Sequence, residues 1–219
     1  MQKRVAPNIK RIVSPSQSSK DGIVSEFNCD HENITVINNG LDTDEFKPMS
    51  ESTRNQYRLI TTASADVPLK GLDYSLKALK DLKSDFPDIH LVVIGSIKEN
   101  GHTQRLINEL DLKDSVYFQS NITKAQITEL YSTSSIAIVS SLYEGFGYPV
   151  IEAMSCEVPL IATNVSSIPE LVNEYATLVD PKNHKMISDS VKEIMLDYGK
   201  YKEIAINGRQ HVIDRFNWA

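Results

Sequence analysis

Short apolar runs alternate with amphipathic stretches along most of the chain. Residues 91–94 and 136–139 are two such runs, and each consists of four consecutive apolar residues. Runs of this length are typical of strands that are buried on both faces of a sheet. Between the runs, apolar residues recur at helical spacing, as at Leu72, Leu76 and Leu79. Strands that alternate with helices indicate parallel crossover units, so the pattern predicts an α/β fold with a Rossmann-like, doubly wound parallel sheet.

The same pattern predicts the position of each element. Strands are expected at residues 11–14, 34–37, 58–62, 90–95, 115–118, 135–139, 159–162 and 176–179. Helices are expected at residues 16–27 and 102–110, from Leu72, after the capping residue Thr123, from Pro149, and along one face marked by Ile187, Val191, Ile194 and Tyr198. In a doubly wound sheet, ligands bind beyond the carboxyl ends of the strands. The loops after Thr62, Gly95, Phe118, Ser140 and Thr163 are therefore the expected site.

Composition narrows the class of protein. The chain has 219 residues, of which 41% are hydrophobic and 24% charged, which is a globular balance rather than a disordered one. The net charge of −6 disfavours a nucleic-acid partner. The two cysteines, Cys29 and Cys156, form no CxxC pair, which disfavours a zinc site and a disulfide scaffold and favours a reducing, cytoplasmic location. No apolar run approaches the ~20 residues that span a bilayer.

Two carboxylates flank a glycine-containing turn after the run at residues 136–139. Glu144 and Glu152 lie eight residues apart, and Gly145 and Gly147 stand between them. Glycine lets the backbone approach a ligand closely, and the amino end of the helix that begins near Pro149 attracts anions. Carboxylates accept hydrogen bonds from sugar hydroxyls, so the segment suits a polyhydroxylated anion. The alternative interpretation is a glycine-rich turn with solvated glutamates.

A lysine occupies the turn after the strand at residues 58–62. Lys70 precedes Gly71, and a lysine at a strand-to-helix turn can neutralise a diphosphate as a point charge. Taken alone, this lysine is better explained as an ordinary surface residue.

The segment at residues 144–153, Glu-Gly-Phe-Gly-Tyr-Pro-Val-Ile-Glu-Ala, resembles the paired-glutamate motif of retaining glycosyltransferases with the GT-B fold, family-four type, the glycosyl transferases group 1. The resemblance implies that Glu144 contacts the donor sugar and that Glu152 binds the ribose. It also implies that Lys70 binds the donor diphosphate, so Glu144 and Lys70 are the candidate catalytic residues. No feature assigns Glu144 as a nucleophile. The further substrate-binding candidates are Gly71, Gly95, Ser120, Asn121, Gly145, Phe146, Gly147 and Tyr148.

The chain departs from the family pattern at several positions. Ala65 stands where the family has a diphosphate-binding arginine, Ile97 replaces the second glycine after Gly95, and Ser120 replaces a glycine of the base-binding loop. Ser166 and Ser167 replace a glycine pair in the segment that ends at Pro169-Glu170, where a positive φ would be strained for serine. These departures leave the identity of the donor open.

The resemblance covers nearly the whole chain but only the second half of a family enzyme. Residues 1–43 resemble the end of the acceptor-binding N-terminal domain with the joining segment, and residues 44–219 the nucleotide-sugar-binding domain. Residues 216–219 resemble the start of the family's final helix. The expected partners are therefore a UDP- or GDP-linked sugar donor, an unidentified acceptor and the missing N-terminal domain of the same protein. We expect this chain not to transfer a sugar efficiently by itself, and membrane association of the whole protein stays open.

No cofactor or metal is expected. Asp42-Thr43-Asp44 imitates the metal-binding DxD of another glycosyltransferase fold, but it lies in the joining segment, and GT-B enzymes generally need no metal for the diphosphate. The alternatives are a non-catalytic nucleotide-sugar-binding module and a nucleotide-sugar epimerase of GT-B type. A dinucleotide-dependent dehydrogenase is disfavoured because no GxGxxG follows the first strand.

Overall fold

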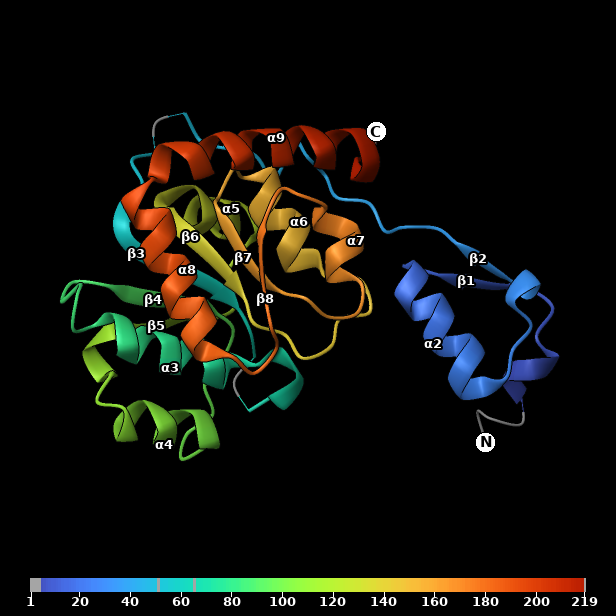
Figure 1. Ribbon diagram of the computed structural model, residues 1–219, viewed down its shortest axis with the longest axis horizontal. Helices are drawn as coiled ribbons and strands as arrows, with labels where there is room; N and C mark the ends of the chain where they lie inside the picture. Colours follow the sequence, from blue (N-terminus) through green and yellow to red (C-terminus); the bar gives the residue numbers. More distant parts are fainter. Residues whose placement is uncertain (1–4, 51, 65, 219) are drawn as a thin grey trace.

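The computed structural model describes residues 5–50, 52–64 and 66–218, which form two parallel sheets joined by one linker (Figure 1). The larger sheet has six strands in the order β5-β4-β3-β6-β7-β8, and every neighbouring pair is parallel. Its strands are β3 (Asn55–Thr62), β4 (His90–Ile94), β5 (Val116–Gln119), β6 (Ser134–Val139), β7 (Leu160–Thr163) and β8 (Thr177–Val179). This order confirms the predicted doubly wound sheet. The chain reverses its direction of winding between β3 and β6, so the loops after these two strands flank the switch point.

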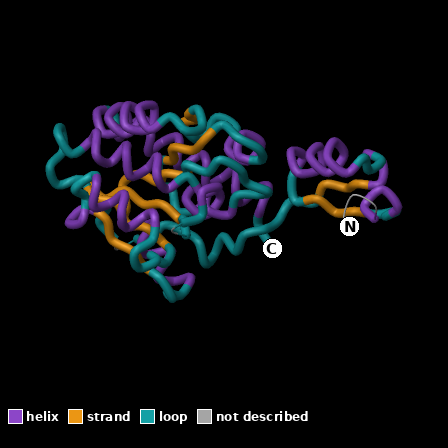
Figure 2. Tube along the Cα trace, turned by 90° about the horizontal axis from the view of Figure 1, so that it is seen from below, coloured by secondary structure: helices purple, strands orange, loops and turns teal. Residues whose placement is uncertain are grey.

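Helices cover both faces of this sheet, as Figure 2 shows. One face packs against α5 (Lys124–Thr133), α6 (Tyr148–Ser155), α7 (Ile168–Val172) and α9 (Tyr198–Phe216). The other face packs against α3 (Leu72–Leu82), α4 (His102–Glu109) and α8 (His184–Leu196). Consecutive strand residues divide between the two cores: Ile136 and Ile138 face α3 and α8, whereas Ala137 and Val139 face α6. Burial on both faces explains why residues 136–139 of β6 are all apolar.

The smaller sheet pairs β1 (Ile12–Ser14) with β2 (Ile34–Val36) in parallel, and α2 (Gln17–Phe27) connects them. Single-turn 3-10 helices lie at η1 (Ala6–Asn8), η2 (His31–Asn33), η3 (Pro68–Lys70) and η4 (Lys113–Ser115). A single linker leads from β2 to the large sheet (Figure 1). This linker pairs with the end of α9, because the backbone N–H of Leu41 donates to Phe216 O at 2.6 Å and that of Trp218 donates to Leu41 O at 3.2 Å.

Several details differ from the sequence predictions, which include no helix at α7. The long helix expected through Tyr198 is two helices, because Asp197 leaves helical geometry at φ −131° and ψ 56° and its carboxylate caps the second one. Phe216 ends α9 and does not begin a further helix, and Asn217 is extended. Pro149 is the second residue of α6 and not the first. Thr123, the predicted capping residue, is the N-cap of α5 and forms a capping box with Gln126.

None of the helices in the described ranges is both long enough and apolar enough to cross a membrane.

Candidate functional site

Lys70 and Glu144 meet at the switch point of the large sheet. Lys70 follows β3 and Glu144 follows β6, and Lys70 Nζ lies 2.6 Å from Glu144 Oε1. The backbone of the two loops is also joined, since the N–H of Leu142 donates to Leu69 O at 2.8 Å. Glu144 is only 8% exposed, whereas the Lys70 side chain is about one third exposed. The two candidate catalytic residues thus form one half-buried ion pair with its cation toward solvent.

Glycine is required where these two loops cross. Gly71 has φ +64°, and a Cβ on it would lie 1.9 Å from Ser140 O. The Ser140 hydroxyl donates to Gly71 O at 2.9 Å, and this hydrogen bond stabilises the close contact between the two loops. Gly95, at the end of β4, has a comparable role, because a side chain there would meet Ala63 O at 2.3 Å. Both glycines therefore allow close backbone approach at the carboxyl edge of the sheet.

The loop that carries Glu144 is held by serine hydroxyls. Ser141 Oγ donates to Glu144 Oε1 at 2.8 Å, so this oxygen receives both a serine and a lysine hydrogen bond. Ser167 Oγ lies within hydrogen-bonding distance of Glu144 O, at 2.9 Å, and of Phe146 O, at 2.6 Å. Phe146 is 5% exposed and its ring packs in the α6 core, so the ring does not face a ligand.

The amino end of α6 points into the same region. Its N-cap residue is Gly147, which has no side chain with which to cap the helix. Tyr148, the first helical residue, is 41% exposed, and its ring contacts Phe146 edge to face at 5.4 Å. Free amides at the positive end of a helix dipole favour an anion.

Glu152 lies one turn further along α6 and ends a chain of hydroxyls. Thr62 Oγ1 pairs with the Tyr131 hydroxyl at 3.0 Å, and that hydroxyl donates to Glu152 Oε2 at 3.3 Å. Burial raises the pKa of Tyr131 well above its usual range, which keeps it a neutral donor. Burial also raises the pKa of Glu152 to about 7, although the Tyr131 hydrogen bond and the Lys124 charge oppose this shift. Near neutral pH, Glu152 is therefore poised between a carboxyl and a carboxylate.

Glu152→Gln is expected to stabilise the protein at pH 8. The folded pKa of about 7 exceeds the usual 4.5, so the folded state loses stability as the pH rises from 4.5 through 7 and the buried group becomes charged. Glutamine carries no such charge. We expect a gain in unfolding free energy on the order of 1–3 kcal/mol at pH 8, shrinking toward pH 4.5. Urea denaturation at both pH values measures it.

The control for this prediction is Glu109→Gln, which makes the same chemical change at an exposed position on α4. It should leave the stability at pH 8 nearly unchanged. A Glu152→Gln variant that is less stable than wild type at pH 8 would contradict the role given to burial of this carboxylate.

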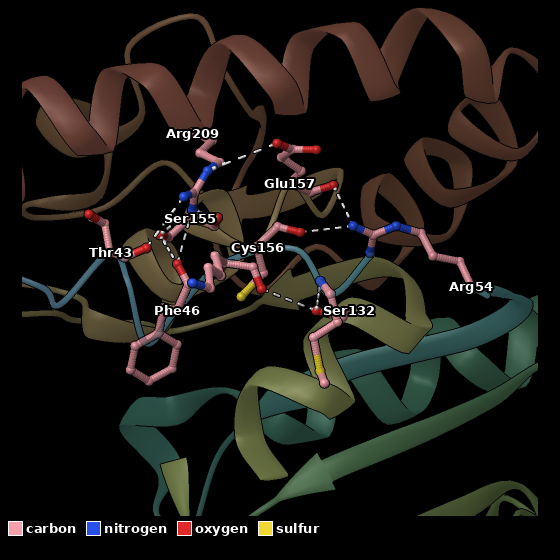
Figure 3. Close-up of polar contacts among 10 residues, drawn as sticks. Thr43, Phe46, Arg54, Ser132, Ser155, Cys156, Glu157 and Arg209 are labelled. Carbon is pink, nitrogen blue, oxygen red and sulfur yellow. Dashed lines mark hydrogen bonds and ion pairs between the residues drawn. The ribbon is translucent and has the colours of Figure 1, made fainter. Parts of the chain in front are cut away.

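Two arginines fix the carboxyl ends of α5 and α6 (Figure 3). Arg54, just before β3, donates from Nη1 to Tyr131 O and Ser134 O, at 3.1 and 2.8 Å. Its Nη2 donates to Cys156 O and Glu157 O, at 2.8 and 2.9 Å. Arg209 of α9 reaches the same turn of α6 and the linker, where it donates to the carbonyls of Ser155, Phe46 and Thr43. These contacts determine where α5 and α6 present Tyr131 and Glu152.

The remaining predicted residues lie around this region. Ser120 and Asn121 are exposed just after β5, next to β4 and Gly95, whose N–H donates to Gln119 O at 2.8 Å. The described contacts do not join Ser120 or Asn121 to the Lys70–Glu144 pair. Ser166 has φ +48°, so the strain expected where serine replaces glycine is present, whereas Ser167 has φ −76°.

Ala65, where the family has an arginine, lies outside the described residues. Its neighbour Asp66 accepts a hydrogen bond from the backbone N–H of Thr103 at 2.8 Å.

In the joining segment, the carboxylate of Asp42 caps the next turn by accepting from the N–H groups of Asp44 and Glu45, both at 3.0 Å. No cluster of three His, Cys, Asp or Glu side chains that could hold a metal occurs among residues 5–50, 52–64 and 66–218.

Two surface hollows bear on where a ligand binds. One of about 630 Å³ lies between the linker and α5, lined by residues such as Met49 and Thr128, and contains none of the predicted site residues. Another of about 200 Å³ adjoins the candidate site through Gly71 and Leu142. We place the site at the switch point and not in the larger hollow, because the charged groups, the glycine crossings and the start of α6 converge there.

Several residues of this region escaped the sequence analysis. Tyr131 and Thr62 are distant in sequence from Glu152, and Ser141 lies in a plain connecting loop. Glu170 was noted only as the end of a family segment, yet its carboxylate contacts the first turn of α2. Ser16, the first residue of the helix predicted at residues 16–27, is the N-cap of α2, and its hydroxyl accepts from the N–H of Ser19.

Comparison with known proteins identifies relatives of the chain. A family model described as Glycosyl transferases group 1 matches residues 43–211. An MMP alpha-(1->4)-mannosyltransferase from Mycolicibacterium hassiacum is 33% identical over all of this chain and 53% of its own length. The O-antigen chain mannosyltransferase RfbU of Salmonella typhimurium is 29% identical over 84% of this chain and 51% of its own length. The chain thus spans about half the length of these curated relatives.

Solved structures share the fold. Anabaena Alr3699/HepE, solved in complex with UDP, superposes with a TM-score of 0.87 at 21% identity, over 98% of this chain and 63% of its own. The C-terminal domain of the glycosyl transferase group 1 family protein LpcC from Francisella tularensis superposes with a TM-score of 0.72 at 26% identity. That match covers 82% of this chain and 100% of the LpcC domain.

Proposed function

Because the chain belongs to the glycosyl transferases group 1, we propose that it is the donor-binding part of a retaining glycosyltransferase that takes a sugar from a nucleotide-diphosphate donor. The observation that carries this proposal is the Lys70–Glu144 pair at the switch point of the sheet. It places a cation that can bind phosphate beside a carboxylate that can bind sugar hydroxyls, in the loop that leads into the uncapped start of α6.

Each charged group has a part in donor binding. Lys70 is released from Glu144 and pairs with the diphosphate, aided by the amide groups at the start of α6. The freed carboxylate of Glu144, with the backbone of Gly145, Phe146 and Gly147, accepts and donates hydrogen bonds to the sugar. Glu152, as a carboxylate oriented by Tyr131, accepts the ribose hydroxyls.

The base lies at the edge formed by β4 and β5. Gly95 permits close approach of the backbone there, and the exposed residues Ser120 and Asn121 contact the base. Tyr148 stands beside the sugar at the open side of the site.

Catalysis follows from stabilising the leaving diphosphate. As the bond from the sugar to the diphosphate breaks, negative charge grows on the phosphate oxygens, and a fixed cation and helix start lower the energy of that charge. Orientation of the sugar by Glu144 contributes the rest. The acceptor is bound by the N-terminal domain of the whole protein, and residues 1–43 are the last part of that domain with the joining segment. Residues 44–219 are the donor-binding domain. This chain alone is therefore a binding unit rather than an efficient enzyme.

The relatives suggest which donor to test first. Two of them are named mannosyltransferases, and a third is a GDP-mannose-dependent mannosyltransferase of Mycolicibacterium smegmatis, 26% identical over 82% of this chain. HepE is a structural neighbour in complex with UDP and with UDP-glucose. A hexosyl donor linked to GDP or UDP agrees both with the mannosyltransferase relatives and with the ligands of HepE.

Calorimetric titration with GDP, UDP and ADP tests the proposal. We expect one of the three to bind, and the corresponding nucleotide-hexose to bind at the same site by competition. If none of the three nucleotides binds to this chain, and none binds to the whole protein to which the chain belongs, the proposal is overturned. Transfer of labelled sugar by the whole protein then identifies the reaction.

A further inference from the structure

The amino end of α2 docks on the loop that carries Glu144. Ser16 Oγ donates to Gly145 O at 2.7 Å and Ser19 Oγ donates to the same oxygen at 2.8 Å. These contacts join parts of the chain that are 129 and 126 residues apart in sequence. In Figure 1 the end of α2 faces α7 and the loops at the edge of the large sheet. The smaller α/β unit is therefore in direct contact with the candidate site.

A carboxylate from the large sheet's side completes this contact. Glu170 Oε2 accepts from the N–H of Gln17 at 3.0 Å, and Glu170 Oε1 accepts from the N–H of Ser18 at 3.1 Å. The N–H of Ser19 is accepted by Ser16 Oγ at 3.0 Å. The first amides of α2 are thus paired, two of them by an anion at the positive end of the helix dipole. The orientation of α2 relative to α7 is fixed by this bidentate contact.

The carbonyls of Glu144, Gly145 and Phe146 each lie within hydrogen-bonding distance of a serine hydroxyl. Ser167 reaches the carbonyls of Glu144 and Phe146 from the large-sheet side, and Ser16 and Ser19 reach the carbonyl between them from α2. Ser16 and Ser167 are fully buried. Without α2, the carbonyl of Gly145 would keep none of these contacts, and glycine would leave its backbone free to rotate.

Ordinary helix capping accounts for Ser16 but not for Ser19. A serine at the N-cap normally accepts from an amide of its own helix, as Ser16 does. Ser19 stands inside the first turn, and its hydroxyl hydrogen bond goes to Gly145 O and to no group of α2. Its contact therefore serves the loop.

From these contacts we infer that Ser16, Ser19 and Glu170 form a dock through which α2 holds the Glu144–Gly147 loop in its donor-binding shape. We call these three residues the α2 dock. They are positioning residues, because Ser16 and Ser19 contact the loop backbone while Glu170 holds the start of α2 in place. The inference rests on the proposed function only for what the loop binds. That the loop is ordered by α2 is a separate statement about this chain.

Ser19→Ala tests the dock, with Ser19→Thr as the conservative variant that keeps the hydroxyl. Hydrogen exchange of the amides at residues 145–148 should be roughly 10-fold faster in Ser19→Ala, because one of the two hydrogen bonds from α2 is lost. Ser19→Thr should restore slow exchange. A second variant, Glu170→Ala, should accelerate exchange at Gln17, Ser18 and the same loop, since it undocks the helix.

Ser25→Ala is the matched control, because Ser25 lies on the same helix and its hydroxyl bonds only locally, to Gly22 O at 3.1 Å. It should leave the loop unchanged. Thermal unfolding of the large sheet should not change in any of these variants, which separates loosening of the loop from loss of the fold. Calorimetry with the GDP- or UDP-linked hexose is the second readout, and affinity for this nucleotide-hexose should fall by roughly 5- to 10-fold in Ser19→Ala.

The outcomes separate the two ideas. Faster hydrogen exchange of the loop in Ser19→Ala and Glu170→Ala, with slow exchange kept in Ser19→Thr, supports the dock. If the wild-type chain binds neither nucleotide, that result counts against the donor site and not against the dock. Unchanged loop exchange in both variants would overturn the dock, whatever the nucleotide result.

Discussion

Arg54→Met is expected to lower the free energy of unfolding by about 3–5 kcal/mol, because it leaves several helix-end carbonyls unpaired beside the core. The guanidinium donates to four carbonyls, those of Tyr131, Ser134, Cys156 and Glu157. A cation at the carboxyl ends of α5 and α6 also interacts favourably with both helix dipoles. For a chain of this size the loss corresponds to a fall in Tm of roughly 10 °C. Thermal and urea unfolding measure it.

Two variants make this result specific. Arg105→Met removes the same charge from an exposed arginine with one carbonyl partner, Asn100 O at 2.7 Å, and should cost under about 1 kcal/mol. Arg54→Lys keeps the charge but loses the planar fork, and should fall between the other two. Equal stability of Arg54→Met and Arg105→Met would show that the four contacts contribute nothing.

Lys70→Met is expected to weaken binding of the preferred nucleoside diphosphate by roughly 10- to 100-fold, the loss of one or two charge-assisted hydrogen bonds. The effect should be equal for the nucleoside diphosphate and the nucleotide-hexose, because Lys70 is proposed to contact only the phosphates. Lys80→Met, on the exposed side of α3, removes the same charge nearby and should bind like wild type. Calorimetric titration of each variant measures the difference.

Glu144→Gln is expected to affect binding of the sugar and not binding of the nucleoside diphosphate. Glu144 is proposed to hold the sugar, and it also pairs with Lys70 in the free protein. Its removal should therefore leave nucleoside diphosphate affinity unchanged or raised, since Lys70 no longer has to leave a partner, while affinity for the nucleotide-hexose falls by roughly 10-fold. Equal losses for both ligands in Glu144→Gln would contradict the division of labour between the two residues.

Much of the architecture was predictable because a strand that is buried on both faces of the sheet shows a local run of apolar residues. A strand such as β6 is apolar at residues 136–139, and a helix such as α3 shows its buried side at Leu72, Leu76 and Leu79. The break between α8 and α9 was missed because apolar spacing continues through Tyr198, while the backbone turns at Asp197. The short helix α7 was missed because five residues carry too little periodicity.

The sequence by itself determined the strand-helix alternation, since this depends on spacing and residue type, and its resemblance to a known family pointed to Lys70, Glu144 and Glu152 as candidate residues. Tertiary structure alone decided that Lys70 and Glu144 form one ion pair, that Tyr131 orients Glu152 and that the start of α2 docks on the Glu144 loop. The physical reason is distance along the chain. Each of these contacts joins residues 21 to 153 positions apart, so it depends on strand order and helix packing, which local periodicity does not encode.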